Sequence, residues 1–158
     1  MALKHHIKIK KASFLHIFKI WVWRNDKLSR KMSINTNKIR LIDHFKWYLK
    51  NLQEKSNTFY IGSYNNTDIG IVRLNKRSNF KNIFEISINL SPLFRGKGFG
   101  KDFLNAALLE FNNKIHGKKK IEAQIKRGNI SSIKLFESCG FYKYKEKIDI
   151  KLFRKELF

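Results

Sequence analysis

The sequence predicts a mixed α/β fold in which helices pack on the faces of one mixed sheet. Short stretches with alternating apolar residues, typical of strands, lie between stretches whose apolar residues recur at helical spacing. The chain has 158 residues, 42% hydrophobic and 14% aromatic, which is enough for a sizeable core. No repeat, low-complexity linker or composition break divides it, so we expect residues 1–158 to form a single domain.

The predicted order of elements is β-α-α-β-β-β-α-β-α-β-β. In the N-terminal half we expect a strand at residues 7–9, a helix at 14–22 behind a cap at Ser13, a polar irregular segment at 24–36, a helix at 41–52, and paired strands at 59–64 and 69–74. Apolar residues at helical spacing define the two helices: Phe14, Leu15, Phe18, Trp21 and Val22 in the first, and Leu41, Ile42, Phe45, Leu49 and Leu52 in the second.

In the C-terminal half, too, predicted strands alternate with predicted helices. We expect a strand at residues 83–90, a glycine-rich loop, a helix at 103–111, a strand at 121–125, a helix at 129–139 closed by Gly140, and a final strand or hairpin around 148–152. Along the strand at 83–90 the side chains alternate, so Glu85, Ser87 and Asn89 share one face.

The charge favours an anionic partner. The chain has 34 Lys and Arg against 12 Asp and Glu, a formal net charge of +22, which suits nucleic acid, a membrane surface or phosphorylated small molecules. Cys139 is the only cysteine, which excludes an intrachain disulfide or a cysteine-based metal cluster. The longest apolar stretch, residues 14–23, is too short for a membrane span, and we expect a cytoplasmic protein without a metal.

The loop Arg95-Gly96-Lys97-Gly98-Phe99-Gly100-Lys101 joins a predicted strand to a predicted helix. Glycines at alternate positions let successive backbone N–H groups turn toward one ligand, and the start of the helix adds its positive end. Such a loop is suited to a phosphate or pyrophosphate. A Walker A loop needs Ser or Thr after the lysine, where Asp102 stands, and the glycine spacing does not match a dinucleotide-binding loop. The simpler alternative is a basic turn that only caps the helix.

Two motifs resemble the GCN5-related N-acetyltransferase (GNAT) superfamily. Residues 95–100 match its Arg/Gln-x-x-Gly-x-Gly/Ala signature, which binds the pyrophosphate of acetyl-CoA. A second block resembles its Asn-x-x-Ala/Ser-x-x-x-Tyr/Phe-x-x-x-Gly-Phe helix: Asn129-Ile130-Ser131-Ser132-Ile133-Lys134-Leu135-Phe136-Glu137-Ser138-Cys139-Gly140-Phe141. The resemblance implies the GNAT fold and acetyl-CoA as cosubstrate. It implies that the cosubstrate contacts Leu90, Arg95, Gly96, Lys97, Gly98, Phe99, Gly100, Lys101, Asn129, Ser132 and Phe136.

The same resemblance implies the chemistry. A backbone donor near Leu90 stabilises the developing oxyanion, and Glu85 is the candidate general base; the alternative for Glu85 is a structural ion pair. Many members carry a Tyr that protonates the leaving thiolate, but Phe136 stands at that position. Either Tyr142 or Tyr144 replaces it, or the thiolate leaves unassisted. Asn129 has the alternative role of a helix N-cap.

The N-terminal third resembles the branch that includes ribosomal-protein N-terminal acetyltransferases, and within it the amino-sugar N-acetyltransferases of the pseudaminic acid pathway. Three short segments carry this resemblance: Trp23-Arg24-Asn25, Met32-Ser33 and Asp43-His44-Phe45-Lys46-Trp47. It implies a nucleotide-linked 4-amino sugar as the acceptor, held by Arg24, Met32, Ser33, His44 and Trp47. A protein N-terminus is the alternative acceptor.

A second class of function competes with the enzyme. A non-catalytic nucleic-acid-binding module explains the net charge of +22, but it gives no reason for the loop at residues 95–101 to occur together with the block at 129–141. We therefore expect an N-acetyltransferase with a small-molecule amine acceptor and no nucleic-acid partner. The oligomeric state is not fixed by the sequence, and a homodimer is compatible with it.

Overall fold

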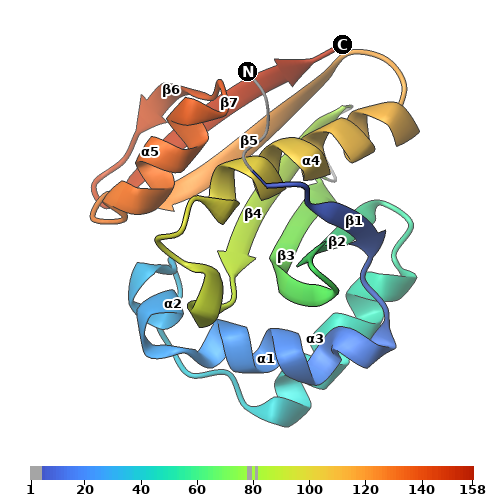
Figure 1. Ribbon diagram of the computed structural model, residues 1–158. Coiled ribbons are helices and arrows are strands. Elements are labelled where there is room, and N and C mark those ends of the chain that lie inside the picture. The colour runs from blue at the N-terminus through green and yellow to red at the C-terminus, as the bar shows by residue number, and fades with distance from the viewer. Residues whose placement is uncertain (1–4, 78–79, 81) are drawn as a thin grey trace.

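The computed structural model describes residues 5–77, 80 and 82–158, and these residues form a seven-stranded sheet of order β1-β2-β3-β4-β5-β7-β6 (Figure 1). The strands are β1 (Lys8–Lys11), β2 (Asn57–Tyr64), β3 (Thr67–Lys76), β4 (Ile83–Leu90), β5 (Lys119–Lys126), β6 (Tyr142–Glu146) and β7 (Ile150–Leu157). Neighbouring strands are antiparallel except β4 and β5, which are parallel.

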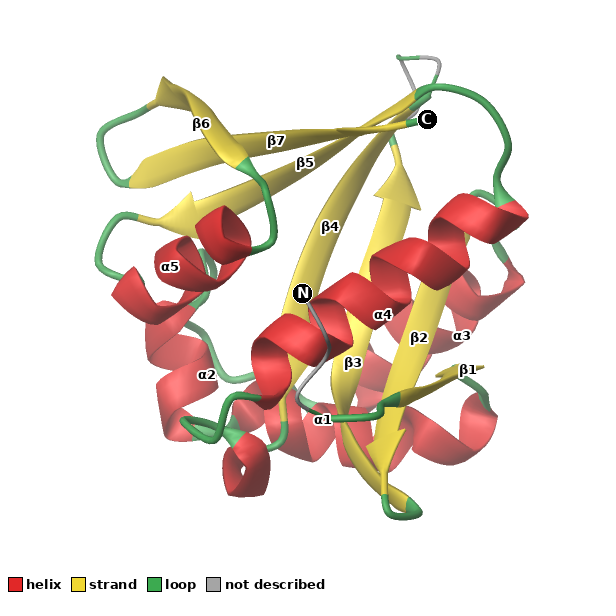
Figure 2. Cartoon of the chain, turned by 45° about the horizontal axis from the view of Figure 1, so that its top comes forward, coloured by secondary structure: helices red, strands yellow, loops and turns green. Residues whose placement is uncertain are grey.

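Helices cover both faces of the sheet. They are α1 (Ile17–Asn25), α2 (Lys27–Met32), α3 (Leu41–Gln53), α4 (Phe99–Lys114) and α5 (Ile130–Ser138), with short 3-10 turns η1 (Phe14–His16) and η2 (Pro92–Phe94). Figure 2 shows α4 and α5 on one side of the sheet and α1, α2 and α3 on the other. The larger core lies under α4 and α5, and a second core joins α1 and α3 to β2 and β3.

The structure confirms the predicted mixed α/β fold and its order of elements, with one addition. The segment at 24–36, expected to be irregular, contains helix α2. The Asp26 side chain accepts hydrogen bonds from the backbone N–H groups of Leu28 and Ser29, each at 3.1 Å, and this cap allows a six-residue helix to form in a polar segment.

The buried faces of helices α1 and α3 coincide only in part with the apolar residues predicted for them: in α3 the predicted Phe45 and Leu52 pack against the second core, whereas Leu41, Ile42 and Leu49 are exposed. Helix α1 buries Ile17, Ile20 and Trp23, whereas four of the expected residues are largely exposed, namely Phe14, Leu15, Phe18 and Val22. Helix α3 buries His44 and Tyr48. His44 Nε2 is hydrogen-bonded to the Ile17 carbonyl, and Tyr48 Oη donates to the Ser13 carbonyl. Burial therefore leaves neither polar group without a hydrogen-bond partner.

The parallel pair β4 and β5 separates along its length. The two strands pair only at residues 83–85 of β4 and 120–122 of β5. Beyond that point β4 still pairs with β3 up to Leu90, but its other edge has no strand partner. This separation opens the sheet beside the glycine-rich loop. None of the helices in the described segments is long and apolar enough to cross a membrane.

Candidate active site

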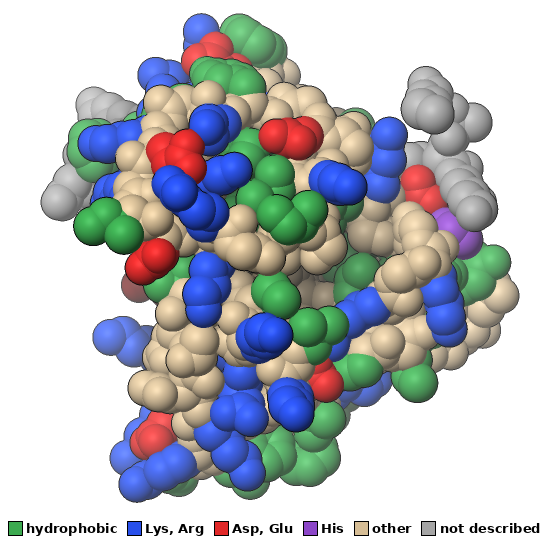
Figure 3. All heavy atoms as spheres, turned by 90° about the vertical axis from the view of Figure 1, so that its left-hand side faces the viewer, with side chains coloured by type: hydrophobic (Ala, Val, Ile, Leu, Met, Phe, Trp, Pro, Cys, Tyr) green, Lys and Arg blue, Asp and Glu red, His purple; other side chains and the backbone are tan. Residues whose placement is uncertain are grey.

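A cavity of about 740 Å³ lies where β4 and β5 separate. Six parts of the chain line it: the end of α1 with α2 and the segment after it, Arg73 of β3, residues 85–90 of β4, the loop at 95–101, residues 123–126 of β5, and the first turns of α5. Figure 3 shows this hollowed face, with Lys and Arg side chains gathered on both sides of the hollow and fewer Asp and Glu. The cavity therefore joins the glycine-rich loop to the N-terminal helices.

The backbone of the loop adopts a conformation that favours glycine. Gly96 has a φ of 69° and Gly98 a φ of 86°, and Gly98 is the N-cap of the 16-residue helix α4. A Cβ at Gly96 would meet no atom within 4 Å, so the dihedral angle and not crowding selects glycine there. The loop presents backbone N–H groups at a helix N-terminus, an arrangement suited to an anion.

The predicted cosubstrate residues of the loop divide into two groups. Five of them line the cavity, namely Arg95, Gly96, Gly98, Gly100 and Lys101. Lys97 is exposed and Phe99 is buried, and neither is among the lining residues. The Phe99 ring packs against His5, Tyr64 and Phe94, which anchors the start of α4 to the core.

The guanidinium of Arg95, a residue that the resemblance assigns to the cosubstrate, forms contacts within the protein. It forms an ion pair with Asp26 and donates to Ser29 Oγ at 2.7 Å and to the Leu90 carbonyl at 3.1 Å. Burial opposes ionisation of Asp26, but the Arg95 hydrogen bond and the N–H groups of α2 outweigh it and hold the pKa of Asp26 below its usual value. Arg95 thus connects α2 to the end of β4 and to the loop.

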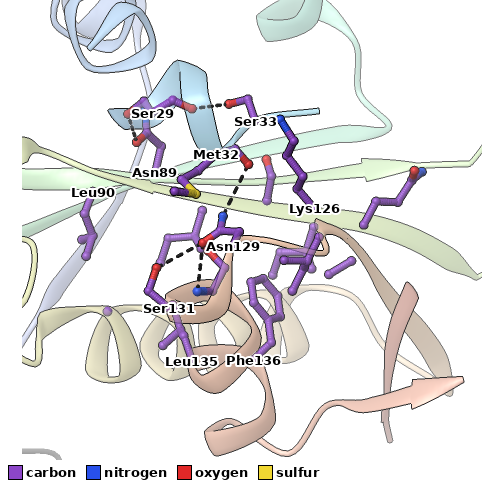
Figure 4. Close-up of a pocket in the computed structure, with 18 of the residues that line it drawn as sticks. Ser29, Met32, Ser33, Asn89, Leu90, Lys126, Asn129, Ser131, Leu135 and Phe136 are labelled. Carbon is purple, nitrogen blue, oxygen red and sulfur yellow. Dashed lines mark hydrogen bonds between the residues drawn. The ribbon is translucent and has the colours of Figure 1, made fainter. Parts of the chain in front are cut away.

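The predicted residues at the start of α5, Asn129, Ser132 and Phe136, all line the cavity. Figure 4 shows Asn129 and Phe136 on the side of the cavity opposite α2. Asn129 Oδ1 accepts from the Ser132 backbone N–H at 3.2 Å, so Asn129 is the N-cap of α5, and its Nδ2 donates to the Met32 carbonyl at 3.4 Å. The Phe136 ring packs against Phe141, with centroids 4.9 Å apart. The alternative role proposed for Asn129, that of a helix cap, is the one that its contacts show.

Three of the five predicted acceptor residues line the cavity: Arg24, Met32 and Ser33. His44 and Trp47 are not among the lining residues. His44 is 2% exposed beneath α1, and burial, together with the charge of Arg73, holds its pKa below the usual value against the opposing hydrogen bond to Ile17. Trp47 stacks on Phe59 and lies 5.3 Å from the Arg73 guanidinium. The structure does not bring these two residues to the cavity.

Glu85 lines the cavity on the β4 face that carries Ser87 and Asn89. Its side chain is 44% exposed, Gln124 donates to its Oε2 at 3.1 Å, and Arg77 lies 3.6 Å from the same atom. Neither of the tyrosines considered as a general acid lines the cavity. Tyr142 is exposed, and Tyr144 lies under the Arg154 guanidinium, 4.0 Å from ring to Cζ.

Among the lining residues that the sequence analysis did not predict, two contact or approach Glu85 or the acceptor residues, namely Arg73 of β3 and Gln124 of β5. Gln124 holds the Glu85 carboxylate. Arg73 stands in an otherwise apolar stretch of β3, between buried Val72 and Leu74. An arginine on a strand that is buried on both sides is an unusual choice, and this signal was available in the sequence. Within the described residues no group of three or more His, Cys, Asp or Glu could hold a metal ion.

Comparison with known families and structures agrees with this geometry. The acetyltransferase (GNAT) domain family matches residues 15–142. A spermidine N-acetyltransferase from Vibrio cholerae, solved with CoA and spermine, superposes with a TM-score of 0.79 at 18% identity, covering 96% of this chain and 94% of that one. A domain from Methanocaldococcus jannaschii has a TM-score of 0.79 at 26% identity, covering 96% and 99%.

A putative phosphinothricin N-acetyltransferase has a TM-score of 0.79 at 22% identity, covering 97% of this chain and 99% of that chain. No curated protein matches the chain significantly. The family match extends over most of the chain, from helix η1 to the start of β6. Its span includes both the glycine-rich loop and the cap of α5. The chain therefore belongs to the GNAT acetyltransferase family and is an N-acetyltransferase.

Proposed function

We propose that the protein transfers the acetyl group of acetyl-CoA to the primary amine of a nucleotide-linked 4-amino sugar, and that residues 1–158 form one N-acetyltransferase domain. The observation that carries this proposal is that one cavity is lined by the glycine-rich loop, by Arg24, Met32 and Ser33, and by Glu85. The acceptor class rests on the resemblance of the N-terminal third to amino-sugar acetyltransferases. Three of the five residues implied by that resemblance line the cavity.

The residues present fit acetyl-CoA. Gly96 and Gly98, both with positive φ, leave the loop N–H groups open to a pyrophosphate at the N-terminus of α4. The edge of β4 at residues 86–90 has no strand partner on the side of β5 and provides backbone groups for the amide-containing pantetheine arm. Ser132 and Phe136 line the same space from α5. When bound, acetyl-CoA supplies a thioester carbon for the amine to attack and a thiolate that leaves.

The chain contributes position and proton transfer. Glu85, held by Gln124, accepts the proton of the acceptor amine directly or through a water molecule. A backbone N–H near Leu90 stabilises the charge that develops on the carbonyl oxygen, an effect worth about 3 kcal/mol. Phe136 has no proton to donate and neither Tyr142 nor Tyr144 lines the cavity. We therefore propose that the thiolate, with a pKa of roughly 8.5, leaves unassisted and is protonated by solvent.

The test is an assay of CoA release with four acceptors: a UDP-linked 4-amino sugar, UDP-N-acetylglucosamine as a matched control without a free amine, spermidine, and a peptide with a free N-terminus. We expect release with the amino sugar only. Release with the peptide alone supports the N-terminal acetyltransferase, and release with spermidine alone supports a polyamine acceptor; either result overturns the proposed acceptor.

A second measurement tests the cosubstrate separately. Acetyl-CoA at about 100 times its Kd should stabilise the fold by about 2.7 kcal/mol in a thermal-shift titration. Absence of a shift, together with a salt-dependent shift on adding RNA, contradicts the use of acetyl-CoA, whatever the acceptor.

A further inference from the structure

Two arginines line the acceptor side of the cavity without a carboxylate partner. Arg24 comes from the end of α1 and Arg73 from β3, on the sheet face that α1 and α3 cover. Three other arginines near the site are paired: Arg95 with Asp26, and Arg77 and Arg154 with Glu122. Arg30 of α2 also has a buried Nε without a partner, but it is not among the lining residues. Among the described residues neither Arg24 nor Arg73 forms an ion pair within 4.0 Å. Glu85 is the one carboxylate among the lining residues.

Arg24 has an unsatisfied buried donor. Its Nη2 donates to the Asn35 carbonyl at 2.7 Å, but its Nη1 is buried and has no hydrogen-bond partner. A buried charged donor without a partner costs free energy, and such groups in native proteins call for an explanation. Burial, and then the charge of Arg30, lower the pKa of Arg24. A hydrogen-bond acceptor placed beside Nη1 would remove this cost.

Arg73 is held rigidly beside it. Its Nε donates to Ser87 Oγ at 2.9 Å, and its guanidinium lies over the Trp47 ring. Burial, and then the nearby charge of Arg24, lower the pKa of Arg73 to about 10, although Glu85 opposes this. Arg73 thus remains protonated at neutral pH. The two positive charges line one cavity, where each raises the free-energy cost of keeping the other protonated.

We infer that Arg24 and Arg73 form an anion-binding subsite that holds a phosphate or carboxylate group of the acceptor while the amine of the acceptor faces Glu85. This inference deepens the proposed function and rests on it. A bound anion supplies the missing partner of Arg24 Nη1 and offsets the repulsion between the guanidiniums. A polycationic acceptor such as a polyamine would add to that repulsion.

The register of β4 gives the expected distance between the anionic group and the amine of the acceptor. Arg73 lies opposite Ser87 in the β3–β4 pair and contacts it, and Glu85 lies two residues away on the same face. Two residues along a strand span about 7 Å. The acceptor is thus expected to carry its anionic group roughly 7 Å or more from its amine, a separation that a nucleotide-linked sugar and a larger amino acid can both provide.

Binding of anions without an amine tests the subsite apart from catalysis. We would titrate uridine diphosphate and, separately, succinate into protein saturated with CoA, so that the glycine-rich loop is already filled. Arg24→Gln and Arg73→Gln are each expected to weaken binding about 10- to 100-fold, the effect of losing a hydrogen bond to a charged group. Arg40→Gln is the matched control, because Arg40 is 77% exposed and paired with Asp43; its binding should equal that of wild type.

The outcomes separate the two proposals. Arginine-dependent binding of uridine diphosphate supports both the subsite and the nucleotide-linked acceptor. Arginine-dependent binding of succinate alone supports the subsite and overturns the nucleotide-linked acceptor. Failure of both anions to bind, or binding unchanged in both variants, overturns the subsite; amino-sugar-dependent release of CoA would then still support the proposed function.

A stability measurement distinguishes a ligand site from a structural role. Without ligand, Arg24→Gln and Arg73→Gln should leave the Tm unchanged or raise it, because each removes an uncompensated charge. Arg154→Gln should lower the Tm, because Glu122 is 3% exposed and loses a partner. A fall in Tm for both cavity variants as large as that for Arg154→Gln would overturn the subsite.

Discussion

The two halves of the cavity are built from different parts of the chain. The half proposed for acetyl-CoA comes mainly from one region of the sequence, the unpaired edge of β4 at residues 86–90 and the glycine-rich loop that follows it, together with the start of α5. The half proposed for the acceptor consists of side chains from five separate elements, among them Arg24 of α1, Arg73 of β3 and Glu85 of β4. A site from one region of the sequence leaves a motif there, whereas a site of scattered side chains leaves only isolated residues.

The largest expected effect lies in the acceptor half. Glu85→Gln removes the proposed proton acceptor and keeps the shape of the side chain, so kcat should fall about 10²- to 10⁴-fold, the usual contribution of a general base. The KM for acetyl-CoA should not change. Steady-state kinetics at neutral pH, with Glu110→Gln as a control on the far end of α4, measures both values. Unchanged kcat would remove Glu85 from the mechanism.

The next effect belongs to the acetyl-CoA half. Gly98→Ala forces a side chain into a φ of 86°, which costs about 1–2 kcal/mol, so the KM for acetyl-CoA should rise roughly 5- to 30-fold. Gly117→Ala is a matched control, because Gly117 has a φ of 84° and open space around its Cβ position, far from the cavity lining. Both variants should lose stability, but only Gly98→Ala should bind acetyl-CoA less tightly. An equal KM in the two variants would contradict the assignment of the loop.

The same contrast explains which parts of the fold and of the candidate site could be predicted from the sequence. The order of strands and helices and the glycine-rich loop were predictable, because each depends on residues close together in the chain. Helix α2 was missed because one side chain, Asp26, decides it. His44 and Trp47 were predicted at the acceptor, but packing of α3 on α1 and β2 turns both away from the cavity. Arg73 interrupts an apolar stretch, which marks it as unusual, but its place at the cavity was not predictable because its partners Ser87 and Trp47 are distant in sequence.

Asp26 caps α2 in the acceptor half and pairs with Arg95 of the loop in the acetyl-CoA half. Its substitution should therefore weaken the binding of both substrates moderately. Asp26→Asn keeps an oxygen to cap α2 but removes the charge that pairs with Arg95. This partly exposed ion pair is worth about 0.5–1 kcal/mol after screening by solvent, so the KM values for both substrates should rise roughly 2- to 5-fold. A change in only one KM, measured with the other substrate saturating, would show that the halves are independent.

Proton linkage predicts a further effect of the same substitution. The pKa of Asp26 lies below its unfolded value of 3.8, so its contribution to stability is present above that pH and is lost as the pH falls through the folded pKa. The difference in Tm between wild type and Asp26→Asn should therefore shrink below about pH 4. Thermal melts between pH 3 and pH 6 measure this difference in Tm. A difference that stays constant over this range would mean that the charge of Asp26 does not contribute to stability.

The smallest effect concerns His44, and its measurement tests whether His44 lies in the core or lines the cavity. Burial, with Arg73, lowers the pKa of folded His44 below 6.5, so its contribution to stability is present above pH 6.5 and is lost as the pH falls through the folded pKa. His44→Gln keeps a donor for the Ile17 carbonyl and removes the titration, so its Tm should fall less between pH 7 and pH 5. Burial lowers the pKa of His16 as well, so part of the slope should remain. A slope equal to that of wild type would mean that His44 does not become protonated on unfolding, and the core position assigned to it would then be wrong.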